Sequence, residues 1–279
     1  MEDGEAMNEQ IRPVRENVDS RLERLEAADR VGEYLHQVLE IGHQMLKSGG
    51  EVSRVEDSLR RMCRAYGAES VDVLTITASI VVTMYSPEYG AVTESRRVVG
   101  QQYDLSRLER LNALSRQICR EKLSAGEIEL QLQNALKPDQ YSFVVQLMTY
   151  VLISSSFCIF FGGSWRDAVA SGLIGVILKF LDRYLRSKDV TPFFPALLCS
   201  LLGGLMAALS VKCGLGENVD MISIGNIMLL IPGLALTNSL RDLFSGDTIS
   251  GLMRFIEAIL LAVIIALGFV LVLTQMQGG

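Results

Sequence analysis

The chain has 279 residues, of which 49% are hydrophobic, and its formal net charge is −6. Residues 1–140 contain 18 Lys and Arg against 24 Asp and Glu, whereas residues 141–279 contain eight of each. This division predicts an acidic domain followed by a membrane domain, and it argues against a nucleic-acid partner, because phosphate binding requires clustered Lys and Arg.

The N-terminal half has the patterns of a cytoplasmic α+β domain, expected to span residues 1–140. Residues 1–12 are expected to lack regular structure, and the polar start has no apolar segment typical of a signal peptide. Helical spacing of apolar residues and runs of β-branched residues predict two helices, three strands and two further helices. These elements are predicted at 14–47, 51–66, 71–76, 79–85, 91–99, 104–122 and 126–136, followed by a linker at 136–140.

The C-terminal half, residues 141–279, contains five candidate membrane spans. They lie at about 141–161, 165–185, 192–211, 219–239 and 252–274. The second is the weakest candidate, because Lys179 and Asp182 lie near its end. The fourth contains Pro232 and Gly233, and proline removes a backbone donor and clashes with the preceding turn. We therefore predict a five-helix transmembrane bundle with a broken fourth helix.

Positive charges are distributed unevenly between the two ends of these spans. With the N-terminus inside, the inner flanks contain Lys137, Arg183, Arg186, Lys188, Arg241 and Arg254. The outer loops contain Arg166 and Lys212. Because cytoplasmic loops carry an excess of Lys and Arg, we expect a multi-pass protein of the cell (inner) membrane with its N-terminal domain in the cytoplasm and its C-terminus outside.

The motifs of nucleotide-dependent and hydrolytic enzymes are absent from the sequence. It contains no G-x-x-x-x-G-K-[ST], G-x-S-x-G or H-E-x-x-H. The two histidines, His36 and His43, lie seven residues apart, and the five cysteines form no C-x-x-C. We therefore predict no enzymatic activity, no metal and no cofactor.

Polar residues gather on both sides of the predicted break. Asn226 precedes it, and Asn238, Arg241 and Asp242 follow it at a helical spacing that places them on one face. Polar groups at membrane depth are tolerated where they face protein, a cavity or a substrate path. The pattern therefore indicates a substrate or ion pathway. The alternative is a cytoplasmic loop at 238–251 in which Arg241 and Asp242 form an interfacial salt bridge.

Glu257 lies one turn inside the fifth predicted span, three residues after Arg254. A carboxylate buried at this depth tends to bind and release a proton, so Glu257 is a candidate for proton coupling, with Asp242 as its rival. The alternative is an Arg254–Glu257 ion pair at the level of the lipid headgroups. Arg241 or Arg254 could bind the carboxylate of a substrate, because guanidinium groups pair well with carboxylates.

Two segments resemble motifs of the threonine/serine exporter family. PGLALTNSLRDLFSGDTISGLMRFIEA, at 232–258, resembles the P-G-x-x-x-x-N-x-x-x-D signature and the sequence that follows it. SGGEVSRVEDSL, at 48–59, resembles the S-G-A-E-x-x-R-V-E-D motif, with Gly50 in place of the more usual alanine. The resemblance covers about residues 33–275. It implies functional roles for Pro232, Gly233, Asn238, Asp242, Gly251, Arg254 and Glu257, and for Gly49, Glu51, Arg54 and Glu56.

Full-length members of this family carry two membrane halves in one chain, whereas this chain resembles the N-terminal-half subunit of the split, two-component form. The resemblance implies a second small polytopic membrane subunit, or a homo-oligomer, and secondary export of threonine, serine or a dicarboxylate such as succinate. The motif at 48–59 would form a cytoplasmic gate or vestibule; alternatively, Arg54 and Glu56 form a structural ion pair. The alternative function is a membrane-anchored sensor or scaffold whose cytoplasmic domain binds a partner.

Overall fold

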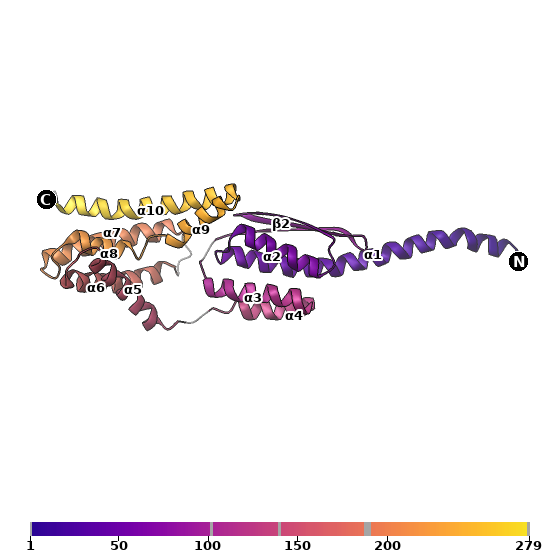
Figure 1. Cartoon of the computed structure of the whole chain (residues 1–279), viewed down its shortest axis with the longest axis horizontal. Coiled ribbons are helices and arrows are strands. Elements are labelled where there is room, and N and C mark those ends of the chain that lie inside the picture. The colour runs from indigo at the N-terminus through magenta and orange to yellow at the C-terminus, as the bar shows by residue number, and fades with distance from the viewer. Residues whose placement is uncertain (1, 101–102, 139–140, 187–190, 278–279) are drawn as a thin grey trace. The chain divides into compact units, whose positions relative to one another are not determined.

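A computed structural model describes residues 2–100, 103–138, 141–186 and 191–277 (Figure 1). Three residues named above lie outside this part of the chain: Asp139 and Gln140 of the predicted linker, and the predicted flanking charge Lys188. The chain divides into two compact units. The first unit comprises residues 1–139 and 238–253, and the second comprises residues 140–237 and 254–279.

The first unit combines helices with a small antiparallel sheet in the order β1-β2-β3. Its elements up to residue 139 are α1 (Glu2–Lys47), α2 (Val52–Ala65), β1 (Ser70–Ile76), β2 (Ser79–Ser86), β3 (Gly90–Arg97), α3 (Leu105–Glu121) and α4 (Ala125–Ala135). Their types and order are those predicted from the sequence. The expectation that residues 1–12 lack regular structure is wrong, because α1 begins at Glu2. Once a helix is nucleated, each added residue forms one more hydrogen bond, so the predicted helix can extend through polar residues.

The core of the first unit lies between the helices and one face of the sheet. Ile80, Val82 and Met84 alternate along β2 and are fully buried, together with Val55 and Leu59 of α2. Alternate residues of a strand point to opposite faces, so this period of two places the apolar set against the helices. The sheet is therefore held to the helices through a single apolar face.

The second unit is built from helices, and α9 and α10 are shared between the two units. The helices are α5 (Phe143–Phe160), α6 (Trp165–Arg186), α7 (Phe193–Lys212), α8 (Val219–Ile227), α9 (Gly233–Phe244) and α10 (Thr248–Gln277). In the described part of the chain, three helices, α5, α7 and α10, are long and apolar enough to cross a membrane. They correspond to the first, third and fifth predicted spans, and the five-helix bundle stays a prediction.

The helix break predicted in the fourth span lies between α8 and α9. α8 ends at Ile227 and α9 begins at Gly233. Between them, the N–H groups of Leu229 and Leu230 bond three residues back, to the carbonyls of Asn226 and Ile227. Pro232 has no N–H and cannot continue the ladder. The interruption therefore follows from a local property of the sequence.

α8 packs very closely against α5 and α6 at Gly225. A Cβ at this position would lie 2.5 Å from the Ser154 carbonyl oxygen and 2.6 Å from Ser171 Oγ. Any side chain larger than a hydrogen atom would push α8 away from both helices. Gly225 therefore permits the close approach of α8 to polar groups of its neighbours.

Candidate functional site

The two sequence motifs meet inside the first unit. The Asn238 side-chain amide donates to the Gly49 carbonyl at 3.2 Å, and Arg241 forms an ion pair with Glu51. These contacts join the turn between α1 and α2 to α9. The motif residues at 48–54 and at 238–242 therefore form one constellation, although about 190 positions separate them in the sequence.

Asp242 binds the N-terminus of α2 from a distant part of the chain. Its side chain is fully buried, and its Oδ1 accepts a hydrogen bond from the Val52 N–H at 3.3 Å. Glu51, the N-cap residue of α2, makes no capping hydrogen bond with its own side chain. The first N–H groups of a helix lack intrahelical partners and carry partial positive charge. Asp242 therefore supplies both an acceptor and a negative charge to this helix end.

The turn that leads into α2 depends on two glycines. Gly49 has a φ of +91°, and a Cβ there would lie 2.6 Å from the Tyr103 ring. A Cβ at Gly50 would lie 2.9 Å from the Met45 carbonyl oxygen. The family motif has an alanine more usually than a glycine at position 50. In this chain an alanine would require the Met45 carbonyl to move.

Glu51 lies between two arginines. It pairs with Arg241 and also with Arg54, whose Nε lies 3.2 Å from Glu51 Oε2. The Glu51 side chain is 14% exposed, whereas those of Arg54 and Arg241 are 79% and 54% exposed. Both guanidinium groups are exposed, so another carboxylate can reach them. Exposed ion pairs are also weak, so such a carboxylate could compete with Glu51 for them.

Among the residues that the structure describes, two ion pairs considered from the sequence, Arg241–Asp242 and Arg54–Glu56, are replaced by other pairings. Arg241 pairs with Glu51 rather than with Asp242, because Asp242 faces the N-terminus of α2. Arg54 does not pair with Glu56, because residues two apart on a helix point in different directions. Glu56 instead pairs with Arg60 at 2.6 Å and accepts a hydrogen bond from the Thr75 N–H.

A small pocket lies at this constellation. Its volume is about 110 Å³, and residues of both motifs line it, including Gly49, Glu51, Arg54, Asn238 and Arg241. Sites for drug-sized ligands measure about 300–1,000 Å³, so this pocket is on the scale of an ion or a small polar group. It therefore could hold a carboxylate or a similarly small group beside the two arginines.

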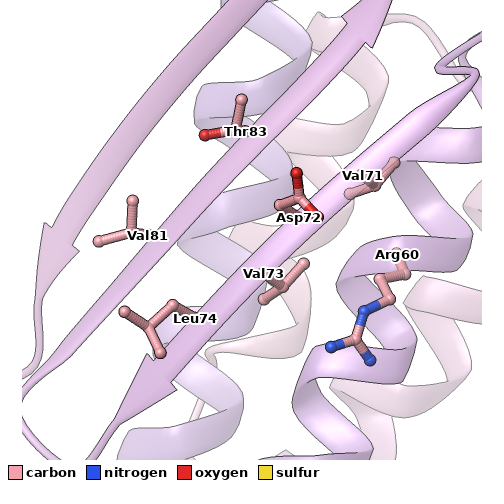
Figure 2. Close-up of a pocket in the computed structure, with 7 residues that line it drawn as sticks. All are labelled: Arg60, Val71, Asp72, Val73, Leu74, Val81 and Thr83. Atoms are coloured by element: carbon pink, nitrogen blue, oxygen red, sulfur yellow. The ribbon is translucent and has the colours of Figure 1, made fainter.

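A second pocket, of about 230 Å³, lies at β1 and is lined by Arg60 of α2 and residues of β1 and β2 (Figure 2). Figure 2 shows Asp72 and Leu74 on the strand beside the α2 helix that carries Arg60. The Arg60 guanidinium is already paired with Glu56. We choose the smaller pocket as the candidate site, because residues of both motifs line it.

Gly251 has a packing role within the first unit. A Cβ there would lie 2.7 Å from the Leu243 backbone nitrogen and 3.0 Å from the Ser239 carbonyl oxygen. The neighbouring atoms belong to the backbone of α9, so they cannot move aside as a flexible side chain could. Gly251 therefore lets the start of α10 approach α9 directly.

The remaining predicted site residues, Asn226, Pro232, Gly233, Arg254 and Glu257, belong to the second unit. Asn226 is buried, Pro232 and Gly233 lie at the helix break, and Arg254 is 2% exposed. The expectation of a buried Glu257 is wrong, because Glu257 is exposed. Within the described residues it also forms no ion pair with Arg254. Position 257 lies on the same face of α10 as the exposed residues Met253 and Leu260, which are one turn away.

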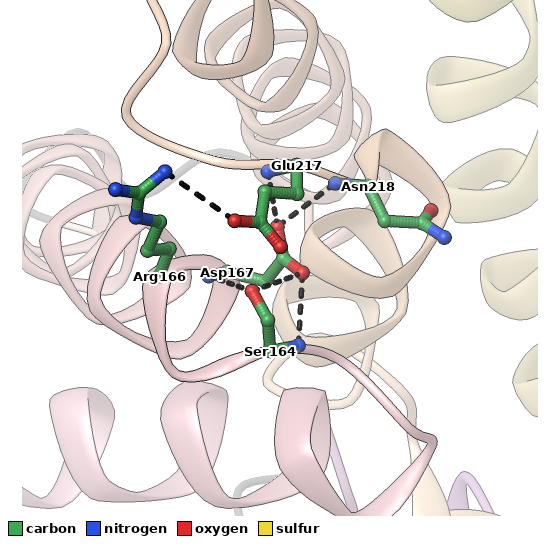
Figure 3. Close-up of polar contacts among 5 residues, drawn as sticks. All are labelled: Ser164, Arg166, Asp167, Glu217 and Asn218. Carbon is green, nitrogen blue, oxygen red and sulfur yellow. Dashed lines mark hydrogen bonds and ion pairs between the residues drawn. The ribbon is translucent and has the colours of Figure 1, made fainter.

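The sequence analysis missed Asp167, which is 1% exposed. Its Oδ1 accepts hydrogen bonds from the N–H groups of Glu217, at 2.7 Å, and Asn218, at 2.9 Å (Figure 3). Its Oδ2 accepts from the N–H and the hydroxyl of Ser164, both at 2.9 Å. Asp167 therefore ties the start of α6 to the segment before α8. The S-x-x-D spacing at 164–167 resembles a capping box and is the signal that could have identified it.

Comparison with known proteins supplies the class of protein: the chain is a membrane transporter protein. It matches the threonine/serine exporter family, ThrE, over residues 36–276, and it belongs to that family. No solved structure matches the chain.

The relatives that resemble this chain differ in length. It is 23% identical over 235 residues to "Probable succinate transporter subunit YjjP" of Klebsiella aerogenes, covering 83% of this chain and 89% of the relative. It is 24% identical over 228 residues to "Threonine/serine exporter" of Corynebacterium glutamicum, covering 79% of this chain and 46% of the relative. The chain thus spans about half the length of the exporter and most of the length of the YjjP protein.

Proposed function

We propose that this protein is one subunit of a secondary transporter that exports a small amino acid, such as threonine or serine, or a dicarboxylate such as succinate. A second polytopic membrane protein would supply the other half. The proposal is supported by family membership and by the names of the relatives. It is also supported by the match to 89% of a relative that is named as a subunit.

The convergence of the two motifs at the N-terminus of α2 is the observation that carries this proposal to particular residues. In this mechanism, Arg241 and Arg54 bind the substrate carboxylate in competition with Glu51. Asp242 carries the coupling proton, because neutralising its charge would weaken its hold on the α2 N-terminus. The exposure of Glu257 favours Asp242 over Glu257 for this role.

The proposed membrane arrangement follows from the charge distribution and the broken helix. The first 140 residues would lie in the cytoplasm, five spans would follow, and the C-terminus would lie outside. Backbone groups freed between α8 and α9 would contribute to the substrate pathway, as broken helices do in other transporters.

The decisive experiment measures efflux of labelled threonine and of labelled succinate from cells that express the chain with its candidate partner. Asp242→Asn and Arg241→Gln should abolish export while membrane insertion is retained. Glu129→Gln, which likewise replaces an exposed carboxylate by an amide but lies outside both motifs, is the matched control and should export normally. Full export by Asp242→Asn would refute the assigned role of the carboxylate. Full export by both site variants would favour a sensor or scaffold.

The partner is tested by purifying the tagged chain in mild detergent and identifying what accompanies it by mass spectrometry. A second small polytopic protein in stoichiometric amount is the expected result. Recovery of the chain with only itself would replace the two-component proposal by a homo-oligomeric one.

A further inference from the structure

Two buried oxygen atoms of α8 have no hydrogen-bond partner within the part of the chain that the structure describes. They are Asn226 Oδ1 and Ser223 Oγ, on side chains that are 0% and 2% exposed. The two residues are three positions apart, so they lie on neighbouring parts of one helix face. Unsatisfied buried polar groups are costly, and more so in a membrane protein, where lipid offers no replacement partner.

The orientation of Asn226 is determined by its neighbours. Its Nδ2 donates to the Ile222 carbonyl at 2.9 Å and to Ser171 Oγ at 3.2 Å. A carbonyl can only accept, so the amide nitrogen must face Ile222 and the oxygen is the atom left over. The Ser171 hydroxyl in turn donates to the Ser154 carbonyl at 3.1 Å. Groups on α5 and α6 therefore hold Asn226 in place through Ser171.

The chemistry of this face suits a compact positive group. Asn226 Oδ1 is a neutral acceptor, Ser223 Oγ can accept, and both lie near the C-terminal end of α8, which ends at Ile227. The C-terminal end of a helix carries partial negative charge, and half-helix ends of this kind coordinate cations in transporters. Divalent cations usually take carboxylate ligands, whereas neutral oxygens suffice for a single positive charge.

We propose that Asn226 and Ser223 form a binding site for a compact, singly charged positive group, which is either a monovalent metal cation or the ammonium group of an amino-acid substrate. The role of this group in coupling or substrate selection rests on the proposed transport function. The binding of a positive group to this site does not rest on the transport function, because binding can be measured on the purified chain without export.

The test measures the melting temperature of the purified full-length chain in detergent. Sodium chloride is compared with choline chloride at equal ionic strength, and L-serine is compared with succinate. The wild type should be stabilised by sodium if the ligand is a metal cation, or by L-serine and not by succinate if it is a substrate ammonium. In Ser223→Ala, the concentration needed for half of this stabilisation should rise about tenfold, as expected for one lost ligand contact.

Ser223→Ala is a clean variant, because the hydroxyl it removes has no partner among the described residues and the fold should be retained. Ser210→Ala is the matched control: its buried hydroxyl donates to the Ala207 carbonyl, and this variant should keep the wild-type response. In Asn226→Ala the concentration needed for half of the stabilisation should likewise rise, by about tenfold or more.

The absence of any sodium- or serine-specific stabilisation in the wild type would overturn the proposal. An unchanged response in both Ser223→Ala and Asn226→Ala would also overturn it. Either result would leave the export function to be judged by the efflux measurements. Conversely, a site-dependent response in a protein that exports nothing would support the site and count against the proposed function.

Discussion

The carboxylate of Asp242 accepts a hydrogen bond from the backbone N–H of Val52, the first residue of α2, across 190 positions of sequence. Val52 follows the S-G-G-E motif, and Asp242 ends the P-G-x-x-x-x-N-x-x-x-D motif. Through this contact, Asp242 of the second motif helps to cap the N-terminus of α2, the helix that follows the turn of the first motif. A change of charge at Asp242 should consequently alter the position of α9 against the start of α2.

Removing the Asp242 carboxylate should destabilise the first unit. Asp242→Ala leaves the Val52 N–H without its acceptor and should lower the free energy of unfolding by about 1–3 kcal/mol. Asp242→Asn keeps an acceptor and should lose about 1 kcal/mol, the value of a charge at a helix N-terminus. Thermal unfolding of the purified chain in detergent would measure both. Equal stability of Asp242→Ala and wild type would contradict the capping role.

The Glu51–Arg241 ion pair should matter more for export than for stability. A double-mutant cycle with Glu51→Gln and Arg241→Gln should give a coupling energy of about 0.2–1 kcal/mol in unfolding experiments, because Arg241 is half exposed. Export should fall much further in Arg241→Gln than this stability change explains. The same cycle on the exposed Arg61–Asp57 pair is the control. A large coupling energy with intact export would instead indicate a structural pair.

Gly251→Ala should separate the start of α10 from α9. The added methyl group would meet the Leu243 nitrogen and the Ser239 carbonyl. We expect the free energy of unfolding to fall by about 1–3 kcal/mol. Gly32→Ala, in α1, is the matched control, because a Cβ there would meet nothing within 4 Å. It should stabilise the chain by about 0.5–1 kcal/mol, since alanine is the better helix former. An unchanged free energy of unfolding in Gly251→Ala would show that α9 and α10 can move apart without loss of stability.

Glu40 should make the stability of the first unit depend on pH. Burial raises the pKa of Glu40, but hydrogen bonds from His43 and Gln44 and the charge of Arg96 outweigh burial and hold the pKa below its ordinary value of 4.5. A carboxyl whose pKa is lowered by folding contributes stability above its ordinary value, and this contribution is lost as the pH falls through the lower, folded-state pKa.

The melting temperature should therefore fall as the pH decreases below about 4.5, and it should fall less steeply in Glu40→Gln than in the wild type. Glu69→Gln, at an exposed position of the same unit, is the control and should keep the wild-type slope. Identical pH profiles for Glu40→Gln and the wild type would assign the acid sensitivity to other groups.

Asp167→Asn should destabilise the second unit strongly. An asparagine offers one oxygen in place of two, and its amide nitrogen would then face N–H donors of Ser164 or of Glu217 and Asn218. Hydrogen bonds to charged groups contribute about 1.5–3 kcal/mol each, so we expect a loss of at least about 2 kcal/mol. Glu217→Gln, which weakens only the exposed pair with Arg166, should change stability by less than about 0.5 kcal/mol. Similar effects of both variants would contradict the role of Asp167 in joining the start of α6 to the segment before α8.

Several features of the fold could be predicted because they depend on local sequence. Pro232 lacks a backbone donor wherever it stands, so the interruption of the helix did not depend on neighbouring elements. The run of β-branched residues at 79–85 likewise indicated a strand, although not which of its faces is buried. By contrast, the extension of α1 to Glu2 depends on a helix nucleated further along the chain, which composition alone did not reveal.

The exposure of Glu257 and the role of Asp167 were not predictable from position in a span. A polar residue within an apolar helix can face inward or outward, and the choice depends on which face of α10 is covered. Asp167 has its acceptors filled by N–H groups of residues 50 positions away. Long-range hydrogen bonds of this kind leave only a weak local signal, in this case the S-x-x-D spacing.

The sequence by itself determined that this chain has an acidic half and an apolar half, and in which order helices and strands follow one another in the first unit. It also determined which residues form two exporter-like motifs. These properties follow from composition, short-range periodicity and residue type. Only the tertiary structure decided that Asn238, Arg241 and Asp242 meet the start of α2 and that Arg241 pairs with Glu51. Such pairings depend on how distant helices pack, because a side chain binds whichever complementary group the fold brings within reach.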